Sequence, residues 1–358
     1  MIIQMKGREK FMNNKDIPMG FTTILVSTVP GITFYIQKMS SKQNSWLAII
    51  IGSILGFLFL KMILYIRSCG NNIFDANKKA LGCFSILINI LLSLTLFLFS
   101  SLIAWHSYVF LKSQYFSETP FLIIALGLII PVSYLIIRKN ATLIRTNTLL
   151  FKIILFLIFG AAFLLSYQFN FENLKPFAEI KNNDLLYGIF VYFSVSILPI
   201  YSLLSIGNLN DKKKAYKYYF LGCLCSLVVS TVTYLVLGKY LVENVAFPEM
   251  YVLRRIGCLT NSARIDSLII SEWIICIFLN VSYSLFYVKN CISYYKSNIN
   301  KYLYLILPFL LFIVSTNTFK DTSIGKNFIR SYYPIISFIV LFGCNFIIFI
   351  ILKIKKKP

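Results

Sequence analysis

The sequence predicts an all-α membrane protein with ten transmembrane helices in two inverted five-helix repeats. Three observations lead to this prediction. The 358 residues are 58% hydrophobic and only 13% charged, whereas soluble domains carry about 25% charged residues. Apolar runs long enough to span a membrane recur along the whole chain. Prolines deep inside four of these runs occupy matching places in the two halves.

The helices are expected in ten apolar runs. A hydrocarbon core about 30 Å thick needs roughly 20 apolar residues in a helix. The runs that meet or approach this length are 17–36, 46–66, 84–111, 121–137, 149–168, 185–206, 218–238, 267–288, 302–317 and 332–352. We therefore expect a single domain, 1–358, built from a first repeat, 1–168, and a second repeat, 185–353.

The four prolines predict where helices are interrupted. Pro30 and Pro131 lie in the first and fourth runs, and Pro199 and Pro308 lie in the sixth and ninth. A helix-interior proline removes a backbone donor and frees a carbonyl. Such a break is tolerated in a bilayer only where protein or a wet cavity covers it. Interrupted helices at corresponding positions of two halves are typical of secondary transporters and indicate a cavity near the bilayer midplane.

The basic residues predict the orientation. The net charge is +22, but the charge lies in short loops, so membrane orientation explains it better than nucleic-acid binding. Alternate loops collect 21 Lys and Arg on one side and 12 on the other, with four and eight acidic residues respectively. Both termini are therefore predicted to be cytoplasmic. The first run is longer than the apolar region of a cleaved signal peptide, so we expect it to be retained.

The sequence contains no recognisable motif of an enzyme active site. The chain contains one histidine and eight scattered cysteines, which predicts neither a metal site nor a disulfide framework. No glycine-rich phosphate loop or paired-carboxylate motif is present. We therefore expect no catalytic residues, no metal and no cofactor.

The broken first and sixth runs carry the first candidate binding residues. Around the first break lie Ser27, Thr28 and Gly31, and around the sixth lie Ser194, Ser196 and Tyr201. Hydroxyl groups beside a break can bind a ligand, and half-helix N-termini suit a carboxylate. The alternative is that these hydroxyls only satisfy the freed backbone groups or allow close helix packing.

Three further residues stand out inside predicted spans. Trp105 and His106 lie in the third run, where a histidine can be a pocket donor or a simple interhelical bond. Glu272 is the one acidic residue placed inside a span. It is a candidate for ion coupling, and the alternatives are that it reaches the interface, pairs with an outer arginine or stays protonated.

The outer segment before the eighth run mixes apolar and basic residues. Residues 247–256 could form a short interfacial helix. Arginines on the outer side run against the usual charge bias. The candidates for partner or interfacial contacts are Arg254, Arg255, Arg264 and Asp266, with simple solvation of the loop as the alternative.

The same segment resembles the B subunit of GerA-type spore germinant receptors. The resemblance rests on order and spacing along essentially the whole chain. The matching residues are Trp46, Thr119-Pro120, Asn173-Leu174-Lys175-Pro176, Lys212-Lys213-Lys214, Gly222, Pro248, Arg255-Ile256, Arg264-Ile265-Asp266-Ser267 and Trp273-Ile274-Ile275.

The resemblance implies a fold, a location and partners. The family belongs to the amino acid–polyamine–organocation transporter superfamily, with a LeuT-like fold of two inverted five-helix repeats. It implies residence in the spore inner membrane and a complex with a membrane A subunit and a lipoprotein C subunit. It also implies recognition of a small nutrient germinant, such as an amino acid, that triggers germination.

Three functions remain open from sequence. In the first, a germinant binds between the first, third, sixth and eighth spans. In the second, the chain is an ion-coupled amino acid or cation transporter, since one fold can host both functions. In the third, it is a scaffold that binds no nutrient, which predicts that Arg254 or Arg255 matters more than the pocket.

Overall fold

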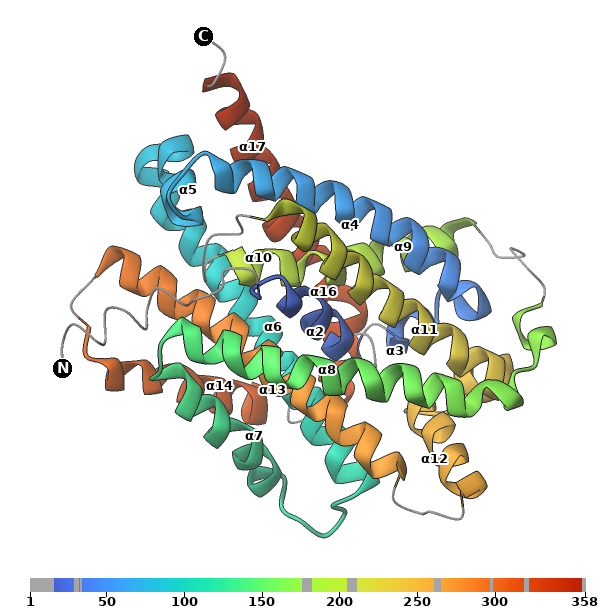
Figure 1. The fold of residues 1–358 in the computed structure, drawn as a ribbon. Helices are drawn as coiled ribbons and strands as arrows, with labels where there is room; N and C mark the ends of the chain where they lie inside the picture. The colour runs from blue at the N-terminus through green and yellow to red at the C-terminus, as the bar shows by residue number, and fades with distance from the viewer. Residues whose placement is uncertain are drawn as a thin grey trace.

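The computed structural model describes residues 16–28, 32, 34–175, 182–204, 211–260, 265–296, 299–318 and 322–355. All regular structure in these residues is helical (Figure 1). The α-helices are α2 (Met19–Thr28), α3 (Phe34–Gln37), α4 (Ser45–Ser68), α5 (Ile73–Leu81), α6 (Ser85–Gln114), α7 (Phe121–Ile136), α8 (Asn140–Leu165), α9 (Asn182–Ser196), α10 (Leu198–Leu204), α11 (Lys212–Asn244), α12 (Pro248–Thr260), α13 (Ile265–Tyr295), α14 (Ile306–Ile313), α15 (Thr322–Asn327), α16 (Tyr333–Ile336) and α17 (Cys344–Lys355).

Eight helical segments in the described residues are long and apolar enough to cross a membrane. They are Lys42–Ser68, Ile73–Gln114, Asn140–Gln168, Asn183–Ile200, Lys212–Asn244, Ser267–Tyr295, Lys301–Thr318 and Ile324–Lys355. Two shorter apolar helices, α2 and α7, coincide with the first and fourth predicted runs. The predicted all-helical membrane architecture is confirmed, and its arrangement as ten helices in inverted repeats stays a prediction.

The first and sixth predicted runs are each divided between two helices. In the first, α2 ends at Thr28 and α3 begins at Phe34; Pro30 and Gly31 lie outside the described residues. In the sixth, α9 ends at Ser196 and α10 begins at Leu198, with a turn at Ile197. Pro199 explains this second division, because it lacks an N–H and its ring clashes with the carbonyl four residues earlier.

The ninth and tenth runs, and the segment between them, contain π-helical turns that the sequence does not predict. These turns are η7 (Val314–Thr318), η8 (Phe328–Tyr332) and η9 (Ser337–Gly343). The predicted interruptions at Pro131 and Pro308 are wrong, because these prolines lie inside the helices α7 and α14. A π turn inserts a residue into the helical ladder and is frequent at functional sites. The C-terminal part of the bundle is therefore less regular than the α4–α8 part.

Helix α2 lies at the centre of the bundle (Figure 1). Nine of its ten residues are buried, and it packs against α8, α10, α11 and α13. Its polar side chains find partners on these neighbours: Thr22 Oγ1 donates to the Tyr218 carbonyl at 2.7 Å, and Thr23 Oγ1 donates to Asn147 Oδ1 at 2.7 Å. Satisfied hydroxyls of this kind allow the threonines of an otherwise apolar helix to be buried in a membrane protein.

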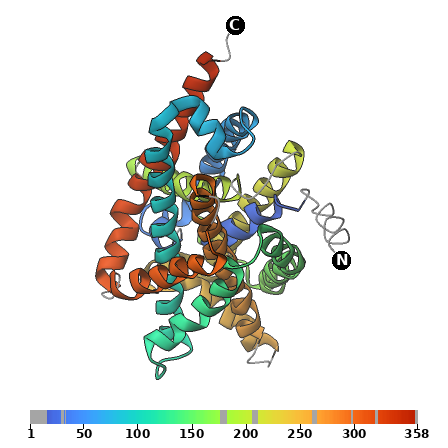
Figure 2. The same cartoon turned by 90° about the vertical axis from the view of Figure 1, so that its left-hand side faces the viewer.

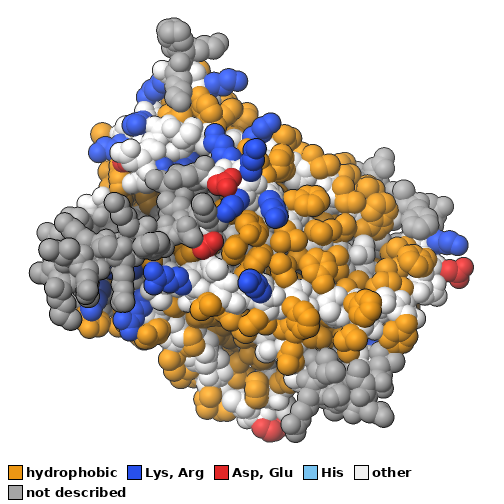
Figure 3. Space-filling view, in the orientation of Figure 1, with side chains coloured by type: hydrophobic (Ala, Val, Ile, Leu, Met, Phe, Trp, Pro, Cys, Tyr) orange, Lys and Arg blue, Asp and Glu red, His pale blue; other side chains and the backbone are white. Residues whose placement is uncertain are grey.

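The outer surface separates apolar and basic regions. On the face shown in Figure 3, hydrophobic side chains cover the middle, and Lys and Arg gather toward the end that carries α5. The C-terminus lies at that same end (Figures 1 and 2). Lys355 Nζ of α17 donates to the carbonyls of Lys79 and Ala80, at 3.0 and 2.9 Å. The described end of α17 therefore lies beside α5, and the membrane side that they occupy stays a prediction.

Candidate functional site

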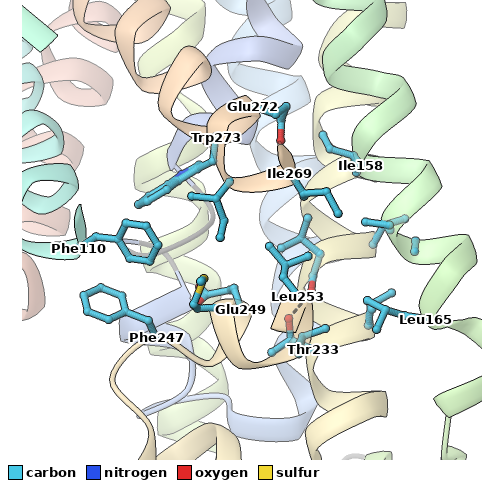
Figure 4. Close-up of a pocket in the computed structure, with 18 residues that line it drawn as sticks. Phe110, Ile158, Leu165, Thr233, Phe247, Glu249, Leu253, Ile269, Glu272 and Trp273 are labelled. Carbon is cyan, nitrogen blue, oxygen red and sulfur yellow. Dashed lines mark hydrogen bonds between the residues drawn. The ribbon is translucent and has the colours of Figure 1, made fainter. Parts of the chain in front are cut away.

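A largely apolar cavity of about 110 Å³ lies among five helices. Its walls come from α6, α8, α11, α12 and α13 (Figure 4). Three of the residues that line it are polar, namely Thr233, Glu249 and Glu272. The other lining residues are Phe110, Ile158, Ala161, Ala162, Leu165, Val228, Val229, Val232, Phe247, Met250, Val252, Leu253, Ile269, Ile270 and Trp273.

Aromatic rings close one side of this cavity (Figure 4). The Phe110 ring centroid is 4.9 Å from that of Trp273 and 5.1 Å from that of Phe247, both in edge-to-face geometry. His106 packs behind them, with its ring centroid 5.7 Å from Phe247 and 6.3 Å from Trp273. Edge-to-face pairs are a preferred arrangement of aromatic rings, so these contacts stabilise the rings in the cavity wall.

Trp273 connects the cavity to the end of the broken first helix. Its indole Nε1–H donates to the Ser27 carbonyl at 3.2 Å. Asn280, seven residues (about two helical turns) further along α13, donates from Nδ2 to Ser27 Oγ at 2.7 Å. Ser27 lies one residue before the end of α2, where helix carbonyls lack intrahelical partners. Trp273 and Asn280 therefore both hydrogen-bond to the C-terminal end of α2.

Glu272 is a buried carboxylate in the cavity wall. Glu272 is 4% exposed, and its Oε1 accepts a hydrogen bond from Cys276 Sγ at 3.0 Å. Within the described part of the chain, the one ion pair joins Lys175 to Glu172, so none includes Glu272. A buried charge without an ionic partner is costly in an apolar environment. Such a carboxylate favours either a proton or a bound cation.

Glu249 lies at the opposite end of the cavity from Glu272 (Figure 4). It is close enough to the Lys38 ammonium to interact with its charge. Lys38 is buried, and its Nζ donates to the Val245 carbonyl in the segment that joins α11 to α12. Burial lowers the pKa of Lys38, the Glu249 carboxylate raises it, and Lys326 lowers it. Lys38 therefore ties the C-terminal end of α3 to the segment that joins α11 to α12.

The predicted site residues of the first and third spans lie beside the cavity and do not line it. Ser27 contacts Trp273 and Asn280, as described above. Thr28 is buried, and its Oγ1 donates to the Leu25 carbonyl at 2.9 Å. Trp105 packs on α15, where a side chain at Gly325 would overlap its ring. The Nε2 of His106 is buried and has no hydrogen-bond partner among the described residues.

The predicted residues of the sixth span contact a different part of the bundle. Ser194 Oγ donates to the Phe190 and Pro334 carbonyls at 2.8 and 3.2 Å, and Ser337 Oγ donates back to the Ser194 carbonyl at 2.7 Å. Ser196 Oγ donates to the Phe193 carbonyl at 2.9 Å. These bonds join α9 to its own turn and to α16 and η9. A role for Ser194 or Ser196 in ligand binding stays a prediction.

The predicted outer residues are described in part. Arg254 Nη2 on α12 donates to Gln114 Oε1 at 3.2 Å, and Arg255 Nη1 donates to the Val236 carbonyl at 3.4 Å. The segment expected to form a short helix, 247–256, is helical from Pro248 onward. Gly31 and Arg264 lie outside the described residues, as do the side chains of Tyr201 and Asp266. Among the described residues, no group of three or more His, Cys, Asp or Glu side chains could hold a metal ion.

Comparison with known proteins identifies related sequences. Residues 17–324 match the family model described as "Spore germination protein". The chain is also 25% identical over 329 residues to YfkT of Bacillus subtilis (strain 168), a protein whose name assigns it provisionally to spore germination. That alignment covers 88% of this chain and 89% of YfkT. The match includes all five helices that surround the cavity.

Proposed function

The chain belongs to the spore germination protein family, and from this membership we propose that it is the B-type membrane subunit of a nutrient germinant receptor. A small nutrient binds in the cavity lined by Trp273, and binding triggers germination. The observation that carries the proposal is the hydrogen bond from the Trp273 indole to the Ser27 carbonyl, because it links the cavity wall to the end of α2.

The mechanism is a shift between two packings of the bundle. A ligand in the cavity contacts Trp273, and Trp273 and Asn280 both hold the C-terminal end of α2. A ligand can shift such an equilibrium only by the difference between its affinities for the two packings. A ligand that binds both packings equally shifts nothing. The contact that changes between packings is proposed to be the α2–α13 contact at Ser27.

The proposal includes an arrangement in the membrane. The ten apolar helices form two inverted five-helix repeats, with both termini on the cytoplasmic side of the spore inner membrane. The divisions after Thr28 and at Ile197 support this arrangement, because they fall at corresponding positions of the two halves. The partners are a membrane A subunit and a lipoprotein C subunit. The exposed end of α12, with Arg254, is the proposed contact with a partner.

Deletion of the gene in its host tests the receptor function. Spores without the gene are expected to lose germination on at least one nutrient from a panel of amino acids, sugars and salts. The intact gene is expected to restore that response. A deletion that leaves the response to every nutrient unchanged, in a strain without a second gene of this family, contradicts the proposal.

A second candidate function is ion-coupled transport, which the buried Glu272 favours. A carboxylate inside a membrane helix can carry a proton or bind a cation during transport. Purified protein in liposomes distinguishes the two functions. Substrate accumulation driven by an ion gradient, and lost in Glu272→Gln, would support transport. A nutrient response in spores without accumulation in liposomes would support the receptor.

A further inference from the structure

We propose that the cavity binds a small apolar amine in its cationic form, with the Glu272 carboxylate as the group that binds the ammonium. This inference names the ligand class of the site in the proposed function and rests on it. The distribution of charge, the aromatic wall and the volume of the cavity each support it.

The charge of the lining residues favours a cation. Among the 18 lining residues, Glu249 and Glu272 are acidic, Thr233 is neutral and polar, and none is Lys, Arg or His. A ligand carboxylate would lie among carboxylates here, and like charges repel strongly where water is excluded. Glu249 already interacts with the charge of Lys38. Glu272 has no ion pair in the described residues, so its charge is the one available to a ligand.

The burial of Glu272 favours pairing of its carboxylate with an ammonium group. At 4% exposure, its carboxylate has lost most of its hydration. The Cys276 thiol is a weak donor to one of its oxygens. An ammonium donates charge-assisted hydrogen bonds, which are shorter and about twice as strong as neutral ones. A bound ammonium would therefore offset the desolvation cost of the Glu272 carboxylate.

The aromatic wall suits the same ligand. Phe110, Phe247 and Trp273 line one side of the cavity, and Trp273 adjoins Glu272 in the sequence. Aromatic faces attract organic cations, and tryptophan does so best. The remaining walls are aliphatic and match a short hydrocarbon body. A hydrated metal ion has no such use for hydrocarbon walls, because hard cations prefer oxygen ligands.

The volume limits the size of the amine. The cavity has a volume of about 110 Å³. An apolar protein cavity of about 150 Å³ binds benzene, which has six non-hydrogen atoms, so by proportion a ligand of roughly four or five non-hydrogen atoms fits here. Isobutylamine has this size and is valine without its carboxylate. Valine adds both volume and a negative charge, and isobutanol keeps the hydrocarbon body without the positive charge.

Tryptophan fluorescence of the full chain in lipid nanodiscs tests the inference. The chain has three tryptophans, so Trp46→Phe with Trp105→Phe leaves Trp273 as the reporter. We expect a saturable emission change with isobutylamine and none with isobutanol or valine.

Glu272→Gln is expected to weaken the amine affinity at least about tenfold, a loss of about 1.4 kcal/mol. The matched control is Glu118→Gln, an exposed glutamate outside the cavity, which should change nothing. Thermal unfolding of the chain with all three tryptophans provides a second measure of binding.

The outcomes separate this inference from the receptor proposal. Equal binding of isobutanol and isobutylamine, or unchanged amine affinity in folded Glu272→Gln, overturns the cationic ligand. If spores still lose a nutrient response on gene deletion, the receptor function stands with a different ligand. Amine binding that depends on Glu272, in a protein whose deletion leaves germination intact, supports the site and contradicts the receptor.

Discussion

At the scale of single residues, the indole N–H of Trp273 is the most informative group. Replacing Trp273 with Phe keeps an aromatic ring in the cavity wall and removes the donor to the Ser27 carbonyl. Hydrogen bonds between membrane helices contribute on average about 0.6 kcal/mol and at most about 1.7 kcal/mol. We expect the nutrient concentration for half-maximal germination to rise roughly threefold, and by no more than about twentyfold, since 1.4 kcal/mol corresponds to a factor of ten.

The matched control for this change is Trp46→Phe. The Trp46 indole nitrogen is buried and has no hydrogen-bond partner in the described part of the chain, so removing it breaks no interhelical bond there. An equal shift of the dose response in both variants would mean that the Trp273–Ser27 bond has no special role. Immunoblots of the spore membranes check that both proteins are present.

Some residues of the site could be predicted from sequence, and others could not. Glu272 was identifiable because a carboxylate inside an apolar run is rare. Trp273 was identifiable through the family resemblance. Phe110, Ala161 and Val232 were not, because an apolar side chain can face lipid, another helix or a cavity equally well. In a membrane protein, apolarity does not distinguish inside from outside as it does in water.

At the scale of helices, the contact of α4 with α9 and α11 depends on Gly56. A side chain there would overlap the Tyr219 hydroxyl and lie 2.6 Å from Ser196 Oγ. Tyr219 is 1% exposed, so its ring cannot swing aside into open space. Gly56→Ala is therefore expected to destabilise the protein by about 1–3 kcal/mol through overpacking. Thermal unfolding in detergent, followed by circular dichroism, measures the change.

Gly127→Ala is the control for that prediction. Nothing lies within 4 Å of a side chain added at Gly127 in α7. Replacing a helical glycine with alanine at such a site gains up to about 1 kcal/mol of helix propensity. A Gly56→Ala protein as stable as Gly127→Ala would show that α4, α9 and α11 pack less closely than described.

Helix positions were more predictable than helix geometry. Helix α4 covers Ser45–Ser68 where 46–66 was predicted, and α7 covers Phe121–Ile136 where 121–137 was predicted. Helix α8 begins at Asn140, nine residues before the predicted start, because its first turns are polar and extend beyond the apolar run. The π turns from Val314 to Gly343 have no composition signal, since they depend on packing against neighbouring helices.

At the scale of the whole molecule, the charge distribution predicts which side each end occupies. The loops predicted on the cytoplasmic side carry 21 of the basic residues, and the described end of α17 contacts the end of α5 through Lys355. A fluorescent protein fused after Pro358 is expected to fold and fluoresce in the cytoplasm. Alkaline phosphatase fused after Asn244 is expected to be active on the outside. Phosphatase activity from the C-terminal fusion would contradict the proposed orientation.

The central claim is that a nutrient acts from inside the cavity, and a cavity-filling variant tests it most directly. Ala161→Phe on α8 adds a ring to the cavity wall, whereas a side chain added at the neighbouring Gly160 meets only open space. The measurement is the germination dose response of spores that carry either variant at normal protein levels. We predict that Ala161→Phe abolishes the response and that Gly160→Phe leaves it unchanged. An unaltered dose response in Ala161→Phe spores would contradict the account.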